Sequence, residues 1–189
     1  MNLSKRLLEI ANIVDRDSTV IDIGCDHGLL DIYLSLYKNC KCIASDISEK
    51  CVKKTLENIK KYNVGNKVDV ILSDGLQKIQ VHNDDIIIIS GMGTRNILNI
   101  LTNLKTNNRL IISSHNDLDI LRKKICKKGY YIFNEIAITD KNIDYVIIDF
   151  RPGTRNYNFL QYKYGPVLIK NKKYEFYFEN IIKKNIVIF

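Results

Sequence analysis

The chain has 189 residues and 46% of them are hydrophobic, which is enough for one domain with a sizeable core and at most a short extension. Lysine and arginine number 29 against 21 acidic residues, so the formal net charge is +8, which is compatible with an anionic partner such as nucleic acid. The composition excludes collagen-like, disulfide-scaffold and acidic disordered proteins, and the longest clean apolar run, 86–89, is too short to span a membrane.

Alternating helix and strand patterns fill the first two thirds of the chain. Strands are predicted at 19–23, 41–45, 68–72, 86–89 and 110–112. Helices are predicted within 3–14, at 29–37, at 49–62 with Ser48 as N-cap, around 97–104 and at 117–128. The continuous apolar run 86–89 is typical of a central parallel strand that is buried on both faces.

Two further strand patterns, 130–138 and 145–150, are separated only by a short turn at 140–142. Five strand–helix units followed by such a hairpin predict a Rossmann-like, mostly parallel, doubly wound α/β sheet with a C-terminal β-hairpin. We expect residues 1–156 to form this domain and 157–189 a short extension, with a loop up to 166 and one helix from 167 to about 184.

The five cysteines are scattered and form no Cys-x-x-Cys pair: Cys25, Cys40, Cys42, Cys51 and Cys126. The three histidines form no His-x-x-x-His or His-Glu-x-x-His pattern, so no metal site is predicted. No signal peptide is visible, because residues 1–11 mix charged and apolar side chains in a helical rhythm. We therefore expect reduced thiols in a cytoplasmic protein.

Polar and glycine residues follow four of the predicted strands, where doubly wound sheets bind their ligands. They are Asp22, Gly24 and Gly28 after the first, Asp46 after the second, Asp74 after the third, and 90–94 after the fourth. A carboxylate at Asp46 is placed to bind both hydroxyls of a ribose, and one at Asp74 to accept from an adenine amino group. Each acid taken alone could be a helix cap, but the whole series predicts a nucleotide-like ligand.

The first of these loops favours S-adenosylmethionine over a dinucleotide. A dinucleotide site uses Gly-x-Gly-x-x-Gly so that the pyrophosphate meets bare amides, and here the middle glycine position is Asp26. Two acids would repel a pyrophosphate, whereas they suit the sulfonium and ammonium groups of S-adenosylmethionine. The pattern thus predicts a seven-strand methyltransferase, with NAD(P) the weaker alternative.

Five motifs together resemble the bacterial tRNA adenine-22 N1-methyltransferases, which are class I methyltransferases that use S-adenosylmethionine. These motifs are 3–7 (Leu-Ser-Lys-Arg-Leu), 22–28 (Asp-Ile-Gly-Cys-Asp-His-Gly), 73–76 (Ser-Asp-Gly-Leu), 91–93 (Gly-Met-Gly) and 164–166 (Tyr-Gly-Pro). The resemblance covers roughly residues 2–184. It implies methylation of adenine N1 in the D-arm region of tRNA. It also implies a long C-terminal helical hairpin, which 157–189 is too short to form.

The expected cofactor-binding residues come from the strand-end loops: Asp22, Gly24, Cys25, His27, Gly28, Asp46, Ile47, Asp74, Gly75, Gly91, Met92 and Gly93. Asp26 is the catalytic candidate, because a carboxylate beside N6 would stabilise the positive charge of the methylated ring or accept its proton. The alternative is that Asp26 only caps the following helix.

The expected RNA-binding residues flank the predicted site: Lys5, Arg6, Arg95, His115 and Asn116. The helix at 117–128 offers further basic side chains, including Arg122, and Arg151 and Arg155 would extend the rim. The family often has Gln-Pro-Asn after the fifth strand, and 113–115 here reads Ser-Ser-His, so the base contact of that segment is an open question. The partner is expected to be tRNA, bound by a monomer away from any membrane.

Three alternatives to tRNA methylation stay open at this point. The protein could methylate another RNA or a small molecule. It could bind the cofactor and RNA without catalysing transfer, a reading suggested by the altered segment 113–115. The least favoured reading is an NAD(P)-dependent oxidoreductase.

Overall fold

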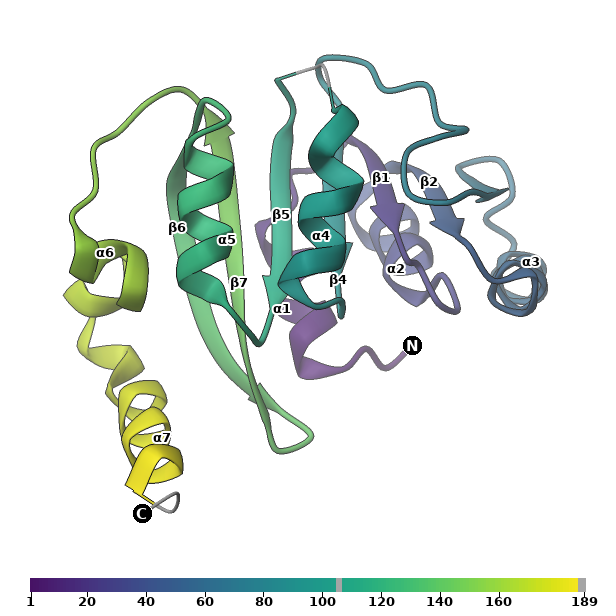
Figure 1. Ribbon diagram of the computed structural model, residues 1–189. Helices are drawn as coiled ribbons and strands as arrows, with labels where there is room; N and C mark the ends of the chain where they lie inside the picture. The colour runs from purple at the N-terminus through teal and green to yellow at the C-terminus, as the bar shows by residue number, and fades with distance from the viewer. Residues whose placement is uncertain (105–106, 187–189) are drawn as a thin grey trace.

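The computed structural model describes residues 1–104 and 107–186, and in this part of the chain seven strands form one sheet (Figure 1). The strand order is β3-β2-β1-β4-β5-β7-β6. Neighbouring strands from β3 to β5 run parallel, and β7 is antiparallel to both β5 and β6. The bounds are β1 Thr19–Ile23, β2 Lys41–Asp46, β3 Val68–Leu72, β4 Ile86–Ser90, β5 Arg109–Ser114, β6 Tyr130–Asp140 and β7 Ile143–Pro152.

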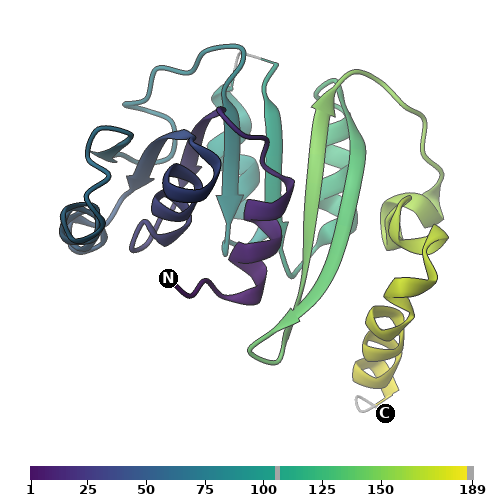
Figure 2. The same ribbon diagram turned by 180° about the vertical axis from the view of Figure 1, so that it is seen from behind.

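Helices cover both faces of the sheet, as Figures 1 and 2 show from opposite sides. One face carries α1 (Lys5–Ile13), α2 (Leu29–Lys38) and α3 (Glu49–Tyr62), and the other carries α4 (Thr94–Ile100) and α5 (Leu118–Cys126). Alternate residues of β4 enter the two separate cores, so this strand is buried on both sides. The predicted doubly wound fold with its C-terminal hairpin is confirmed.

The order of the strands places a ligand site at the carboxyl ends of β1 and β4. The chain leaves β1 toward β2 and β3, and then crosses back to β4 on the other side of β1. The loops after β1 and β4 therefore diverge in opposite directions and leave a crevice between them. Ser48 caps α3 as expected, with its Oγ accepting from the backbone N–H of Cys51 at 3.4 Å.

The C-terminal prediction is wrong in detail. The expected loop before 166 contains α6 (Phe159–Tyr164), and the expected single helix is divided into short turns at Leu168–Lys170 and Lys172–Tyr174 followed by α7 (Glu175–Ile186). Asn158 and Gln161 form a capping box that starts α6. Polar residues such as these are also typical of loops, which is why the sequence pattern predicts a loop here. Leu168, Tyr174 and Tyr177 are buried against the core beside α5, so this segment packs onto the sheet edge.

Arg122 is not available to bind RNA, contrary to the sequence expectation. Its side chain is 1% exposed, and its Nε donates to Oε1 of Glu135 on β6 at 2.7 Å. Its Nη1 donates to the carbonyl oxygen of Tyr162 at the end of α6. A buried guanidinium needs such partners, so Arg122 joins α5 to β6 and α6. The lysines of α5 remain exposed.

No helix in the described part of the chain is long and apolar enough to cross a membrane. Across residues 1–104 and 107–186, histidine, cysteine and acidic side chains nowhere gather in a group of three that would hold a metal ion. All five cysteines are free, and Cys25, Cys40 and Cys42 are buried.

Candidate active site

A cavity of about 790 Å³ lies at the carboxyl ends of the first three strands. Six predicted cofactor residues line it: Gly24, Asp46, Ile47, Asp74, Gly75 and Met92. Ile47 leaves 70% of its surface exposed at this cavity, so an apolar face is open to a planar ring. Three residues that were not predicted, Gln77, Asn96 and Asn99, add amide groups to its wall.

A second cavity, of about 330 Å³, adjoins the first. Both are lined by the same three residues, Gly24, Asp46 and Met92. The second cavity extends toward α1 and the end of β4, and it is lined further by Arg6, Leu7, Asp22, Cys25, Asp26, His27, Leu29, Leu30, Ser90 and Gly91. The two cavities together bring most of the predicted site residues around one crevice.

The junction of the two cavities is formed by bare backbone at Gly24. This residue has φ +78°, and a Cβ atom there would lie 2.2 Å from Cε of Met92. The N–H groups of Gly24 and Cys25 both donate to the carbonyl oxygen of Ser45, which holds the loop against β2. Only glycine allows this conformation without strain and lets a ligand approach the backbone closely.

Asp46 presents a fixed carboxylate between the two cavities. Its Oδ2 accepts from the N–H of Asp26 at 3.1 Å, and its Oδ1 accepts from the N–H of Ser48 at 2.9 Å. Two backbone donors hold one rotamer, while the carboxylate keeps further acceptor sites. The arrangement can therefore accept from a pair of neighbouring hydroxyls.

Asp22 forms part of an acidic pair below the second cavity. It is 4% exposed, and burial raises its pKa to about 7, opposed by a hydrogen bond with Asp31 and by the charge of Arg6. Asp31, in the first turn of α2, is fully buried, and burial raises its pKa well above its usual range. The hydrogen bond between the two carboxyls raises the pKa of Asp31 and lowers that of Asp22, so Asp31 holds the proton and donates it to Asp22.

Asp26 lies at the mouth of the second cavity with 73% of its side chain exposed. It adopts the left-handed conformation, with φ 54°, and its Oδ1 lies 3.1 Å from Nδ1 of His27. The N-cap of α2 is Gly28, which makes no side-chain cap bond. The capping alternative for Asp26 is therefore excluded, and its catalytic role stays a prediction.

Arg6 and Ser90 form the far wall of the second cavity. Nη1 of Arg6, on α1, donates to Oγ of Ser90 at the end of β4 at 2.7 Å. Of the other residues predicted to bind RNA, Lys5 and Arg95 are exposed in the first turns of α1 and α4. Within the described residues, neither of them lines a cavity of the crevice.

Gly28 and Gly93 line neither cavity in the part of the chain that the structure describes. Gly28 packs against Thr55 of α3, where a Cβ atom would lie 2.5 Å from Cγ2 of that threonine. Gly93 is the N-cap residue of α4 and lies close to the side chain of Asn116. Both glycines shape the loops rather than the cavity walls.

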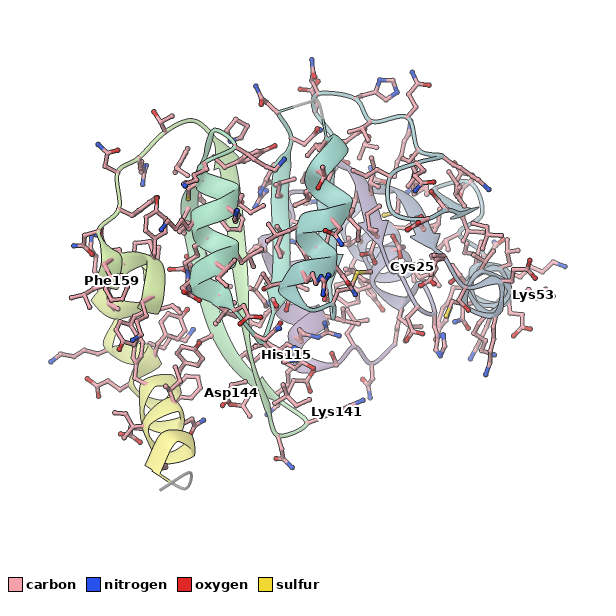
Figure 3. The ribbon with its side chains drawn as sticks, in the orientation of Figure 1. Cys25, Lys53, His115, Lys141, Asp144 and Phe159 are labelled. Atoms are coloured by element: carbon pink, nitrogen blue, oxygen red, sulfur yellow. The ribbon has the colours of Figure 1, made fainter. Side chains whose placement is uncertain are left out.

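Asn116 builds the start of α4, which competes with its predicted contact to a base. Its Oδ1 accepts from the N–H of Thr94 at 3.1 Å, and its backbone carbonyl accepts from Oγ1 of Thr94 at 2.7 Å. Its Nδ2 donates to Oδ2 of Asp117. His115, next to it, is exposed at the carboxyl edge of the sheet, as Figure 3 shows.

Arg151 and Arg155 do not extend the rim of the site. Phe150 pairs with Leu110 near the amino end of β5, whereas the site lies at its carboxyl end. Arg151 therefore lies at the opposite end of the sheet, where its guanidinium stacks on Phe133 at 4.0 Å. The expectation overlooked that an antiparallel last strand finishes away from the site.

Sequence reasoning missed Asp31 and Tyr145, which contact Asp22 and Arg6 of the site. Asp31 falls on the inner face of a predicted helix, and a charged residue there was a usable signal. Tyr145 carries no local signal, because only the pairing of β5 with β7 brings it to the site.

Residues 3–148 match the family model of a methyltransferase domain. A Mycoplasma genitalium protein whose name describes a tRNA methyltransferase is 33% identical over 153 residues, covering 77% of this chain and 68% of the relative. The tRNA (adenine(22)-N(1))-methyltransferase of Bacillus subtilis is 27% identical over 161 residues, covering 82% of this chain and 68% of the relative.

The solved structure of Mycoplasma capricolum TrmK with S-adenosylhomocysteine superposes with a TM-score of 0.87 at 30% identity, covering 98% of this chain and 86% of that one. The match extends over nearly the whole of this chain. The chain belongs to the methyltransferase family that includes the tRNA (adenine-22-N1) methyltransferases.

Proposed function

We propose that the protein transfers a methyl group from S-adenosylmethionine to N1 of an adenine in the D-arm region of tRNA, at position 22. This proposal rests on the two adjoining cavities at the carboxyl ends of the strands, next to the crevice between β1 and β4, in a chain related to enzymes of that activity. The first cavity would take the adenosine part of the cofactor. The second would take its amino-acid part and the target base.

The residues of the crevice fit this cofactor. Asp46 has the fixed geometry to accept from both ribose hydroxyls, and the exposed face of Ile47 suits an adenine ring. The buried carboxyl of Asp22 suits a cationic ammonium group and would repel a pyrophosphate. When bound, S-adenosylmethionine supplies an electrophilic methyl group on a positively charged sulfur.

The chain's own task is mainly to position the acceptor. Adenine N1 attacks with a ring lone pair, so no base is needed beforehand, and collinear placement supplies most of the acceleration. The bond from N1 to the methyl carbon forms as the bond from that carbon to sulfur breaks, and the positive charge moves to the adenine ring. The carboxylate of Asp26, at the mouth of the second cavity, would stabilise this charge beside N6.

A paired adenine hides N1, so the target must be extruded or already unpaired. Phosphate contacts from Lys5, Arg6 and Arg95 would then supply affinity around the crevice, with His115 near the base. We place the catalytic domain at residues 1–156 and the extension at 157–189, of which 187–189 lie outside the described residues. The sheet ends at Pro152 and α6 begins at Phe159, which supports this division.

We also propose that the protein acts as a monomer in the cytoplasm. Each chain carries both cavities of the crevice within its own residues, so no second copy is needed to complete them. The five free cysteines favour a reducing compartment.

The test is transfer of a labelled methyl group to tRNA that carries or lacks the D-arm adenine, followed by nucleoside analysis. Transfer only to the first RNA, with N1-methyladenosine as the product, is the expected result. Equal transfer to both RNAs would point to another target. Cofactor binding without any transfer would indicate a non-catalytic protein, and an N6 product would refute the proposed chemistry.

A further inference from the structure

The β6–β7 hairpin reaches past the carboxyl edge of the sheet, beside the crevice (Figures 1 and 2). β6 and β7 have 11 and 10 residues, against 5 or 6 in the parallel strands. Ser114, the last residue of β5, pairs with Val146. Antiparallel register therefore brings Tyr145 opposite His115, and the hairpin tip at 139–145 lies beyond the sheet.

Tyr145 contacts two predicted RNA-binding residues from different elements. Its ring meets the ring of His115 edge-on, with centroids 5.6 Å apart and planes at 77°. The guanidinium carbon of Arg6 lies 4.9 Å from the centroid of the same ring. Asp140, on the other strand of the hairpin, accepts from the backbone N–H of Arg6 at 3.3 Å. The hairpin thus holds α1 and the end of β5 together.

Arg6 is restrained on its other side by the end of β4. Nη1 of Arg6 donates to Ser90, and the guanidinium also packs against the backbone of Gly91. Any side chain at Gly91 would collide with it, because a Cβ atom there would lie 2.8 Å from Nη1. An arginine side chain free in solvent has much rotamer entropy to lose on binding. Here the tyrosine ring, the serine hydroxyl and the glycine fix the guanidinium in advance as a wall of the second cavity.

We propose that Tyr145 is a positioning residue for the target nucleotide. It holds Arg6 so that the unused N–H groups of the guanidinium meet the phosphate of that nucleotide, and it holds His115 against the base. Arg6 uses one N–H on Ser90 and retains others for a charge-assisted bond to phosphate. This inference rests on the proposed function and adds the hairpin to the RNA side of the site.

The first experiment compares Tyr145→Leu and Tyr145→Phe with wild type, measuring kcat, KM for tRNA and the dissociation constant for S-adenosylmethionine. Loss of the ring should lower kcat/KM for tRNA about tenfold, mainly through KM, as expected for a positioned cation–π contact. Phenylalanine keeps the ring face and should stay within about twofold of wild type. Cofactor affinity should not change. Ile143→Ala, an exposed change on the same hairpin, is the matched control.

The second experiment measures coupling between Tyr145 and Arg6. If Tyr145 acts through Arg6, the losses in kcat/KM caused by Tyr145→Leu and Arg6→Lys should not add in the double variant. Additive losses would overturn the proposal. If Tyr145→Leu does not fold, Tyr145→His in the same cycle makes the same test, because it changes the ring facing Arg6.

A third readout follows the target base directly. 2-Aminopurine placed at the target position of tRNA should lose fluorescence on binding wild type, and lose less on binding Tyr145→Leu. If wild type transfers no methyl group to tRNA, the proposed function fails. If wild type transfers it, and Tyr145→Leu matches wild type in kcat/KM and in quenching, only the role of Tyr145 is refuted.

Discussion

Replacing Asp31 by Asn should stabilise the protein at alkaline pH. Raising the pKa of Asp22 from its usual 3.8 to about 7 costs about 4 kcal/mol once the group is ionised, and Asp31 adds a cost of the same sign. The pKa of Asp22 is higher in the folded protein than in the unfolded chain. The stability that the neutral carboxyl contributes is therefore fully present below about pH 4 and is lost as pH rises through about 7. The Asp31→Asn substitution removes one buried charge and offers an N–H donor to Asp22.

We expect the variant to gain about 2 kcal/mol at pH 8, about half of the cost of Asp22, since that carboxyl remains buried. For a chain of this length the gain corresponds to a rise in Tm of about 4–8 °C. At pH 5, little more than one pH unit above the usual carboxyl pKa of 3.8, this cost has developed only in part, so the rise in Tm should be clearly smaller than at pH 8.

The measurement is thermal unfolding of both proteins at pH 5 and pH 8. Asp69→Asn, an exposed change on β3, serves as the control for altered net charge. No gain at pH 8, or an equal gain at both pH values, would refute the reasoning that the acidic pair shares a proton.

Three further predictions concern the cofactor, the reaction and the fold. Affinity for S-adenosylmethionine, measured by calorimetry, should rise about tenfold from pH 6 to pH 8, because Asp22 ionises through about pH 7 and then attracts the ammonium group; a flat profile would count against that contact. Asp26→Ala should lower kcat about a hundredfold in single-turnover assays with cofactor affinity nearly intact, and unchanged turnover would remove Asp26 from the mechanism. Arg122→Ala should lower the free energy of unfolding in urea by about 3–5 kcal/mol, since Glu135 would be left buried and unpaired; a loss below about 1 kcal/mol would contradict this.

Most of the fold follows from local patterns. The strands β1 and β3 and the helix α3 with its Ser48 cap have the predicted bounds, because periodicity, caps and strand-end glycines all act within a few residues. The cofactor side of the crevice is predictable for a related reason. Parallel strands carry their carboxyl ends to one edge of the sheet, so the repeated strand–helix pattern alone predicts Asp22, Asp46 and Asp74 at one edge, where the two cavities lie.

The positions of the residues predicted to bind RNA depend on contacts between residues that are distant in the sequence. Arg122 has the same local pattern as its lysine neighbours, and only Glu135 on β6 shows that it is buried. Tyr145 is an ordinary strand residue until the register of β5 and β7 places it beside His115 and Arg6. Periodicity records which face of an element is apolar, but not which partner meets that face. Contacts between residues 30 or 134 positions apart follow from packing of the whole chain, and only the tertiary structure could show them.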